Sequence, residues 1–99
     1  MLGFIDKSPA HSAALARVKE WTRARFRLSE DTTIFAAEIA CGLPGCPPLE
    51  TVVVFWTGAE TRHQFKVFKP VNRVIEDDLP PAWMKPGLIV DPDAGFACC

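Results

Sequence analysis

The four cysteines of the sequence are the residues whose types and spacing could do chemistry, and they lie in two close pairs. Cys41 and Cys46 flank a short segment rich in glycine and proline, and Cys98 and Cys99 are adjacent. Thiolates are strong nucleophiles and soft metal ligands, so the four together could hold zinc, hold an iron–sulfur cluster or exchange with a disulfide. We therefore take Cys41, Cys46, Cys98 and Cys99 as the candidate metal ligands.

The spacing of the two pairs bears on which site they could form. A single zinc ion needs more ligands than Cys41 and Cys46, and either the second pair or His63 could supply them. Neighbouring side chains of an extended segment point to opposite sides, so one zinc ion would use only one of Cys98 and Cys99. An iron–sulfur cluster could use both, because each thiolate can bind a different iron. Two other interpretations stay open: thiol exchange through the second pair, and cysteines that bind nothing, with Cys41 a small buried apolar residue.

The composition predicts one domain over residues 1–99. The chain is 48% hydrophobic and long enough to form a core without disulfides or metal, so the cysteines are not required for folding. Residues 1–7 and 91–99 show no periodicity and are expected to be mobile. No segment has the length and apolar character of a signal peptide or a membrane span, which predicts a cytoplasmic protein whose thiols are free, metal-bound or cluster-bound.

The charge argues against a dedicated nucleic-acid-binding protein, because the net charge is −1 whereas such proteins carry a basic excess. Basic side chains nonetheless concentrate in residues 17–27 and acidic ones in residues 76–93. The expected partner is therefore another protein, and neither a membrane nor a nucleic acid is expected.

The first predicted element is a helix that begins at Ser8-Pro9, an N-cap residue followed by proline at the first helical position, and that ends near Leu28. Apolar side chains recur on one side of it at helical spacing. They are Leu15, Val18, Trp21 and Leu28, with Ala14 and Phe26 at the margins. Arg25 falls within this stripe, where it could extend past the core edge or pair with an acid from the C-terminal region.

Three strands are predicted, over residues 32–40, 51–57 and 62–69, from their β-branched and alternating apolar residues. An even-length connection between the last two, centred on residues 59–60, would make one face of the pair apolar. That face would contain Val52, Val54, Trp56, His63, Phe65 and Val67. The other face, with Val53 and Phe55 beside polar side chains, is then expected to contact solvent or a partner.

The prolines at positions 80, 81 and 86 exclude a long helix or a central strand after residue 70. Short helical turns are expected there instead, and one of them should deliver Trp83 and Met84 to the core. The predicted fold is therefore α+β, with one N-terminal helix packed on a three-stranded antiparallel β-meander and an irregular proline-rich C-terminal arm that contains short helical turns.

Other titratable residues give weaker signals. His63 lies on the expected core face, where a buried histidine is expected rather than a catalytic base, and His11 should be exposed in the first helical turn. The acidic run of residues 76–78 could bind a hard cation, and Glu38 with Glu50 could form an acid–base pair. Nothing near them supplies a nucleophile or a phosphate-binding loop, so the chain is not expected to be an enzyme.

Two resemblances add to this interpretation. Residues 44–48, Pro-Gly-Cys-Pro-Pro, followed closely by Glu50, resemble the P-G-C-P-P-x-x-E stretch of the iron–sulfur subunit of respiratory complex I and of the small subunits of nickel–iron hydrogenases. The motif cysteine of that family ligates a cluster, and the complex I subunit also uses a tandem cysteine pair. The resemblance therefore implies a four-iron, four-sulfur cluster at Cys46 and, more loosely, at Cys98-Cys99.

The second resemblance covers most of the chain. It is similar to short bacterial proteins, of the type found in rhizobia, that share P-G-C-P-P-x-E-T, F-K-V-F-K-P and D-D-L-P-P-A-W-M-K and that end in cysteines. From all of these features we expect a small cytoplasmic accessory protein that binds another protein and carries a cysteine-ligated metal or iron–sulfur cluster. The alternatives are a metal-free interaction module and a thiol redox switch.

Overall fold

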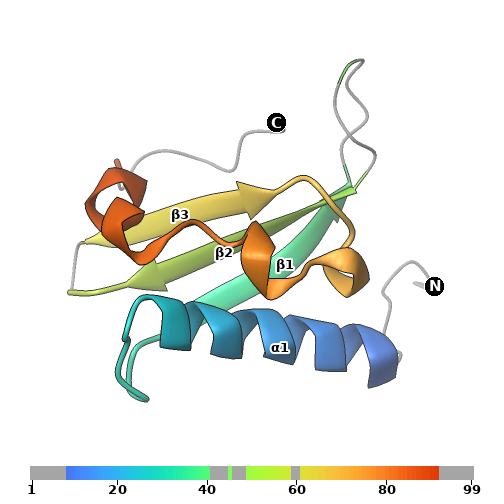
Figure 1. The fold of residues 1–99 in the computed structure, drawn as a ribbon, viewed down its shortest axis with the longest axis horizontal. Coiled ribbons are helices and arrows are strands. Elements are labelled where there is room, and N and C mark those ends of the chain that lie inside the picture. The colour runs from blue at the N-terminus through green and yellow to red at the C-terminus, as the bar shows by residue number, and fades with distance from the viewer. Residues whose placement is uncertain (1–8, 41–44, 46–48, 59–60, 92–99) are drawn as a thin grey trace.

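The computed structural model describes residues 9–40, 45, 49–58 and 61–91. In chain order, the helices and strands are α1 (Pro9–Arg25), β1 (Ile34–Ala40), β2 (Leu49–Trp56), β3 (Arg62–Val67), the 3₁₀ turns η1 (Val71–Arg73), η2 (Glu76–Asp78) and η3 (Ala82–Leu88), and β4 (Ile89–Val90) (Figure 1). The strands form one antiparallel sheet in the order β1-β2-β3-β4. In the described ranges, no helix has the length and apolar character that a membrane span requires.

The predicted α+β class agrees with this architecture, but the predicted three-stranded meander is wrong because the sheet has four strands. Ile89 and Val90 form β4, which pairs with His63 and Arg62 at the edge of β3. A strand of two residues is too short to show alternation in the sequence, and this one follows a proline-rich segment that predicts turns. Only the pairing with β3 identifies it as a strand.

Helix α1 begins at Pro9, the residue at which the sequence predicts its first turn, and ends at Arg25 rather than near Leu28. The backbone N–H of Leu28 donates to the carbonyl of Arg23 at 2.9 Å, and that of Arg27 donates to the carbonyl of Ala24 at 3.4 Å. Arg27 has a φ of 54°, so these bonds form the left-handed turn that commonly closes a helix. The helix ends earlier than predicted because Arg27 takes the position that glycine usually occupies there.

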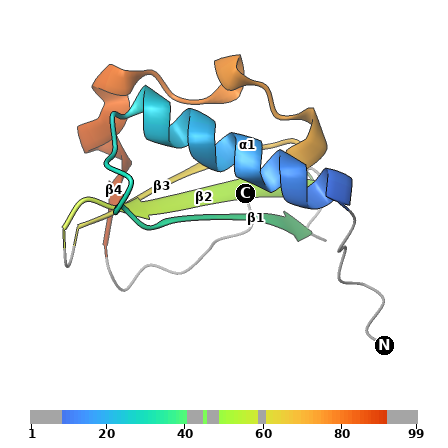
Figure 2. The same cartoon turned by 90° about the horizontal axis from the view of Figure 1, so that it is seen from below.

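The core lies between α1 and one face of the sheet. The helix buries Ala14, Val18 and Thr22, which are spaced four residues apart, and the Thr22 hydroxyl donates to the carbonyl of Val18 at 2.8 Å. Just past the helix, the ring of Phe26 stacks on Phe55 of β2 with centroids 5.3 Å apart. Figure 2 shows that α1 and the segment from η1 to η3 lie on the same side of the sheet. This segment, residues 70–88, is called the C-terminal arm below.

The register of β2 and β3 differs by one residue from the predicted one. Val53 pairs with Phe65 and Phe55 pairs with His63, because the connection is the odd-length segment 57–61, in which the N–H of Thr57 donates to the carbonyl of Thr61 at 3.1 Å. A shift of one residue moves each side chain of β2 to the other face. Val53 and Phe55 are therefore core residues, fully buried beneath α1, and the prediction that they contact solvent or a partner is wrong.

The C-terminal arm buries different side chains from those predicted. Trp83 is 79% exposed and Met84 is also exposed, so the expectation that they reach the core is wrong. Leu79 and Leu88 are buried instead. In a segment interrupted by prolines the direction of each side chain depends on the local turns rather than on a period, and the sequence did not specify those turns.

Arg25 joins the helix to the arm. Its guanidinium donates to the backbone carbonyls of Leu79 and Pro80, at 3.1 and 3.0 Å, and to that of Glu76, at 3.2 Å. Hydrogen bonds from a charged donor are stronger than neutral ones, and the planar guanidinium can reach several acceptors at once. Arg25 thus extends past the core edge, as one of the two sequence-based alternatives predicts, but its acceptors are carbonyls rather than a carboxylate.

We expect Arg25→Ala to lower the free energy of unfolding by about 1–3 kcal/mol, because three carbonyls lose a charged donor. Urea denaturation followed by circular dichroism measures this change. Arg17→Ala is the matched control, since Arg17 is exposed on the same helix, and its effect should stay within about 0.5 kcal/mol. Equal effects of the two substitutions would show that the arm does not depend on Arg25.

Candidate functional site

The four cysteines predicted as metal ligands, Cys41, Cys46, Cys98 and Cys99, lie outside the described residues. Between the first two, Gly45 is described and has a φ of 85°, a conformation in which a larger side chain would be strained. Such a φ is typical of a glycine in a turn. The role of the cysteines stays a prediction.

The described residues that precede the two cysteine pairs lie at opposite ends of the sheet. Cys41 directly follows Ala40, which pairs with Leu49 at one end, whereas the chain leaves β4 at the other end, beside the connection between β2 and β3. The eight residues of β2 extend about 26 Å. Residues 92–98 can span at most about 24 Å. A site shared by both pairs would therefore need this segment to run almost fully extended back along the sheet.

Within the described part of the chain, no group of three or more His, Cys, Asp and Glu side chains is placed to hold a metal ion. In the acidic run of residues 76–78, the carboxylate of Asp78 is held by other contacts. Both carboxylate oxygens of Asp78 lie 3.0 Å from Nζ of Lys69, and one of them accepts the N–H of Ile75 at 2.9 Å. The N–H of Ile75 and then the ammonium of Lys69 lower the pKa of Asp78. This carboxylate stabilises the arm rather than binding a free cation.

His63, the substitute metal ligand in the sequence analysis, is 3% exposed on the core face. Its ring stacks on Phe55 with centroids 4.7 Å apart and an angle of 7° between the planes. Burial lowers the pKa of His63, and the positive charge of Lys85 lowers it further, while backbone hydrogen bonds at Phe55 and Thr61 oppose the shift. The imidazole therefore stays neutral over a wider pH range than an exposed one. The prediction that His63 is a buried histidine of the core is confirmed.

Glu38 and Glu50 do not form a carboxylate pair. Glu38 pairs with Thr51 and Glu50 pairs with Ile39, so the two side chains lie on opposite faces of the sheet. Glu38 lies on the face of α1, where its Oε2 accepts the N–H of Val71 at 2.9 Å. Glu50 is 1% exposed on the other face, with Nζ of Lys66 3.5 Å from its Oε2. Each carboxylate thus has a separate structural contact.

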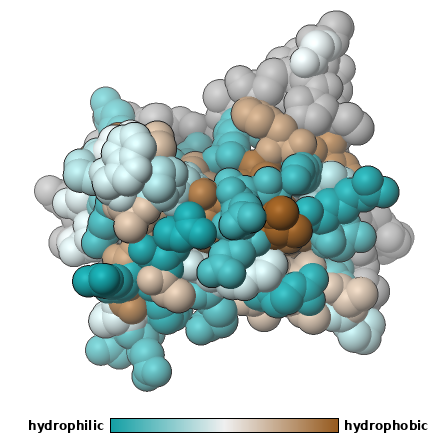
Figure 3. All heavy atoms as spheres, in the orientation of Figure 1, coloured by the Kyte–Doolittle hydropathy of each residue, from teal (hydrophilic) through white to brown (hydrophobic). Residues whose placement is uncertain are grey.

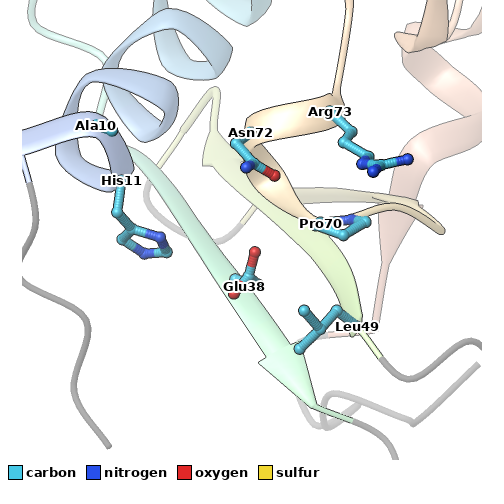
Figure 4. A pocket seen from close by; sticks show the side chains of 7 residues that line it. All are labelled: Ala10, His11, Glu38, Leu49, Pro70, Asn72 and Arg73. Carbon is cyan, nitrogen blue, oxygen red and sulfur yellow. The ribbon is translucent and has the colours of Figure 1, made fainter. Parts of the chain in front are cut away.

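A pocket of about 370 Å³ lies where the first turn of α1 meets the start of the arm (Figure 4). Its lining consists of Ala10, His11, Glu38, Leu49, Pro70, Asn72 and Arg73. Hydrogen-bond donors and a carboxylate meet there beside apolar side chains, which suits a small polar molecule. The described lining contains no hydroxyl or thiol group.

Away from this pocket, large apolar side chains of the arm and β4 are exposed. Trp83 and Met84 of η3 are 79% and 37% exposed, and Ile89 of β4 is 53% exposed. We call these three residues the arm surface. Sequence reasoning missed it because aromatic and sulfur-containing side chains in a small domain are usually expected in the core. The neighbouring prolines, which prevent regular packing, were the available signal.

The shifted pKa of His63 predicts a pH dependence of stability. Below about pH 6.5, the ordinary pKa of histidine, the unfolded chain binds a proton that folded His63 resists, so the free energy of unfolding should decrease as the pH falls from there towards the lower folded pKa. Asp78 acts separately, because its lowered pKa affects stability only below about pH 3.9. Urea titrations between pH 7.5 and 5 measure the decrease.

His63→Gln should remove most of this slope, while His11→Gln, a substitution outside the core, should retain it. A slope that is the same in the wild type and in His63→Gln would assign the pH dependence to another group.

Comparison with protein-family models, with curated proteins and with solved structures found no match. The resemblance of residues 44–50 to the iron–sulfur subunits stays a prediction.

Proposed function

We propose that this chain is a small accessory protein of the cytoplasm that binds another protein through the arm surface, and that it is not an enzyme. The observation that carries the proposal is Trp83, a large aromatic side chain that is 79% exposed on a segment held in place by contacts on both sides. Tryptophan and methionine are enriched in protein interfaces, and tryptophan often contributes most of the binding energy.

The support for a preformed surface comes from the contacts that fix η3. The N–H of Met84 donates to the carbonyl of Pro81 at 2.9 Å, and Nζ of Lys85 donates to the carbonyl of Phe26 at 3.4 Å. Leu88 is buried, and the next residues pair with β3. A surface that is already ordered loses less conformational entropy when a partner binds.

The surroundings of the arm surface favour an apolar segment of a partner protein over a broad apolar interface. In Figure 3 the apolar areas on this side of the molecule are small and separated by hydrophilic ones, and a pale surface projects at the place of η3 in Figure 1. A few apolar anchors surrounded by polar side chains are typical of interfaces that form and separate.

We expect Trp83→Ala to lower the affinity for such a partner at least tenfold, because the substitution removes the largest exposed anchor. The protein can be used to select binders from a random peptide display library, and the selected peptides measured by isothermal titration calorimetry. Phe68→Ala is the matched control: Phe68 is also an exposed aromatic residue, at 53%, but lies outside the arm surface.

The selected peptides should be rich in aliphatic and aromatic residues, and binding should survive Phe68→Ala. Peptides that bind the wild type and Trp83→Ala equally, or a library that yields no binder, would contradict the proposed surface.

The second candidate function is binding of a cysteine-ligated metal or iron–sulfur cluster, or thiol exchange, at Cys41, Cys46, Cys98 and Cys99. Its support is the four clustered thiols and the resemblance of the Cys46 segment to cluster-binding subunits. A cluster would supply electron transfer or a structural link between the two segments.

Anaerobic reconstitution with iron and sulfide should give visible absorption and about four irons per chain if all four thiols ligate one cluster. Two double variants, Cys41→Ser/Cys46→Ser and Cys98→Ser/Cys99→Ser, should then each lose it. Loss in only one variant would show that the pairs do not share a site, and a colourless, metal-free wild type would rule out the cluster.

A further inference from the structure

We propose that β1 pairs with β1 of a second copy of this chain, antiparallel and about a two-fold axis at Ala37, so that two four-stranded sheets join into one. Strand β1 has seven residues and lies at the edge of the sheet, with β2 on one side and no other described strand beside it. The long unpaired edge of an apolar strand is a template for pairing with another strand.

The backbone groups that point outward follow from the pairing with β2. The N–H of Trp56 donates to the carbonyl of Thr33 at 3.4 Å, so Thr33 and Trp56 form a hydrogen-bonded pair. Hydrogen-bonded and non-hydrogen-bonded pairs alternate along an antiparallel ladder. Alternate residues of β1 therefore direct their N–H and C=O groups away from β2. These residues are Ile34, Ala36, Glu38 and Ala40.

Among the described residues, β1 has few of the features that usually protect an edge strand. Its sequence, Ile-Phe-Ala-Ala-Glu-Ile-Ala, has no proline and no lysine, and its register with β2 runs without a bulge from Ile34 to Ala40. Its single charged residue, Glu38, already accepts the N–H of Val71 on the helix side. The other edge of the sheet is different, because β4 has only two residues.

The side chains select one register for a two-fold pair. With the axis at Ala37, the outward groups of Ile34 meet those of the partner's Ala40, and those of Ala36 meet the partner's Glu38, and each such pair can exchange two hydrogen bonds. Phe35 then lies opposite the partner's Ile39.

Phe35 is 45% exposed and Ile39 is partly exposed, so this pairing covers apolar surface on the face opposite α1. Moving the axis to Glu38 would place the two Glu38 carboxylates opposite each other, which is unfavourable. The arm surface lies by the other edge of the sheet and stays accessible in this dimer, so the proposal does not depend on the proposed function.

The test is a charge-swap series measured by sedimentation velocity over a range of concentrations. The wild type should be a dimer that dissociates on dilution. Phe35→Asp and Ile39→Lys should each shift the dissociation constant at least tenfold towards monomer, because each buries an unpaired charge at the new interface. The double variant Phe35→Asp/Ile39→Lys should dimerise again, because the introduced carboxylate of one copy would face the introduced ammonium of the other.

Phe68→Asp, a matched change at an exposed aromatic residue outside β1, should leave the dimer unchanged. If circular dichroism shows that a charged variant does not fold, Ala40→Pro is used in its place. Proline at position 40 removes one outward N–H that β2 does not use, so this variant should also favour the monomer. A wild type that stays monomeric at 0.5 mM (about the highest practical concentration), single variants that remain dimeric, or a double variant that remains monomeric would each overturn the proposal.

Discussion

The packing of α1 on the sheet and on η1 is the contact on which the rest of the structure depends. Small side chains face the sheet along the helix, since Ala14, Val18 and Thr22 are its buried residues, and they allow the helix to lie close to β1 and η1. Val53 and Phe55 of β2 belong to the core cluster that the helix covers. Thr22 can occupy this apolar interface because its hydroxyl is satisfied by the carbonyl one turn earlier. Stacking of Phe26 on Phe55 closes the core where the helix ends.

This helix-to-sheet layer leaves one side of the core open, and the C-terminal arm closes it. Val71, Val74, Leu79 and Leu88 supply the apolar contacts, spaced irregularly along a segment that is interrupted by prolines. Polar contacts fix the path between them: the guanidinium of Arg25 binds arm carbonyls, and Lys69 pairs with Asp78. These valine and leucine side chains point into the core, whereas Trp83, the largest side chain of the arm, is exposed.

The two edges of the sheet differ in a way that bears on association. The β4 edge is short and lies beside η3, whereas the β1 edge is long, apolar and regular. The face of β2 opposite α1 also contains fully buried residues, since Val52 and Val54 are 0% and 1% exposed and Glu50 is buried beside Lys66. Burial of a carboxylate is costly unless it is paired, so this face is an organised part of the structure and not simply a solvated surface.

The sequence by itself determined the class of the fold, the start of the helix at Pro9, and the three longer strands, because these features depend on local periodicity and on the restricted backbone of proline. It also placed His63 on the core face, and it left two alternatives for Arg25, of which the structure shows extension past the core edge. Only the tertiary structure decided the register of β2 and β3, the fourth strand and the exposure of Trp83. In each case two arrangements fitted the local sequence almost equally well, and long-range contacts decided between them. The apolar surface of α1 selected the face of β2 that contains Val53 and Phe55. Pairing with β3 ordered Ile89 and Val90 as a strand.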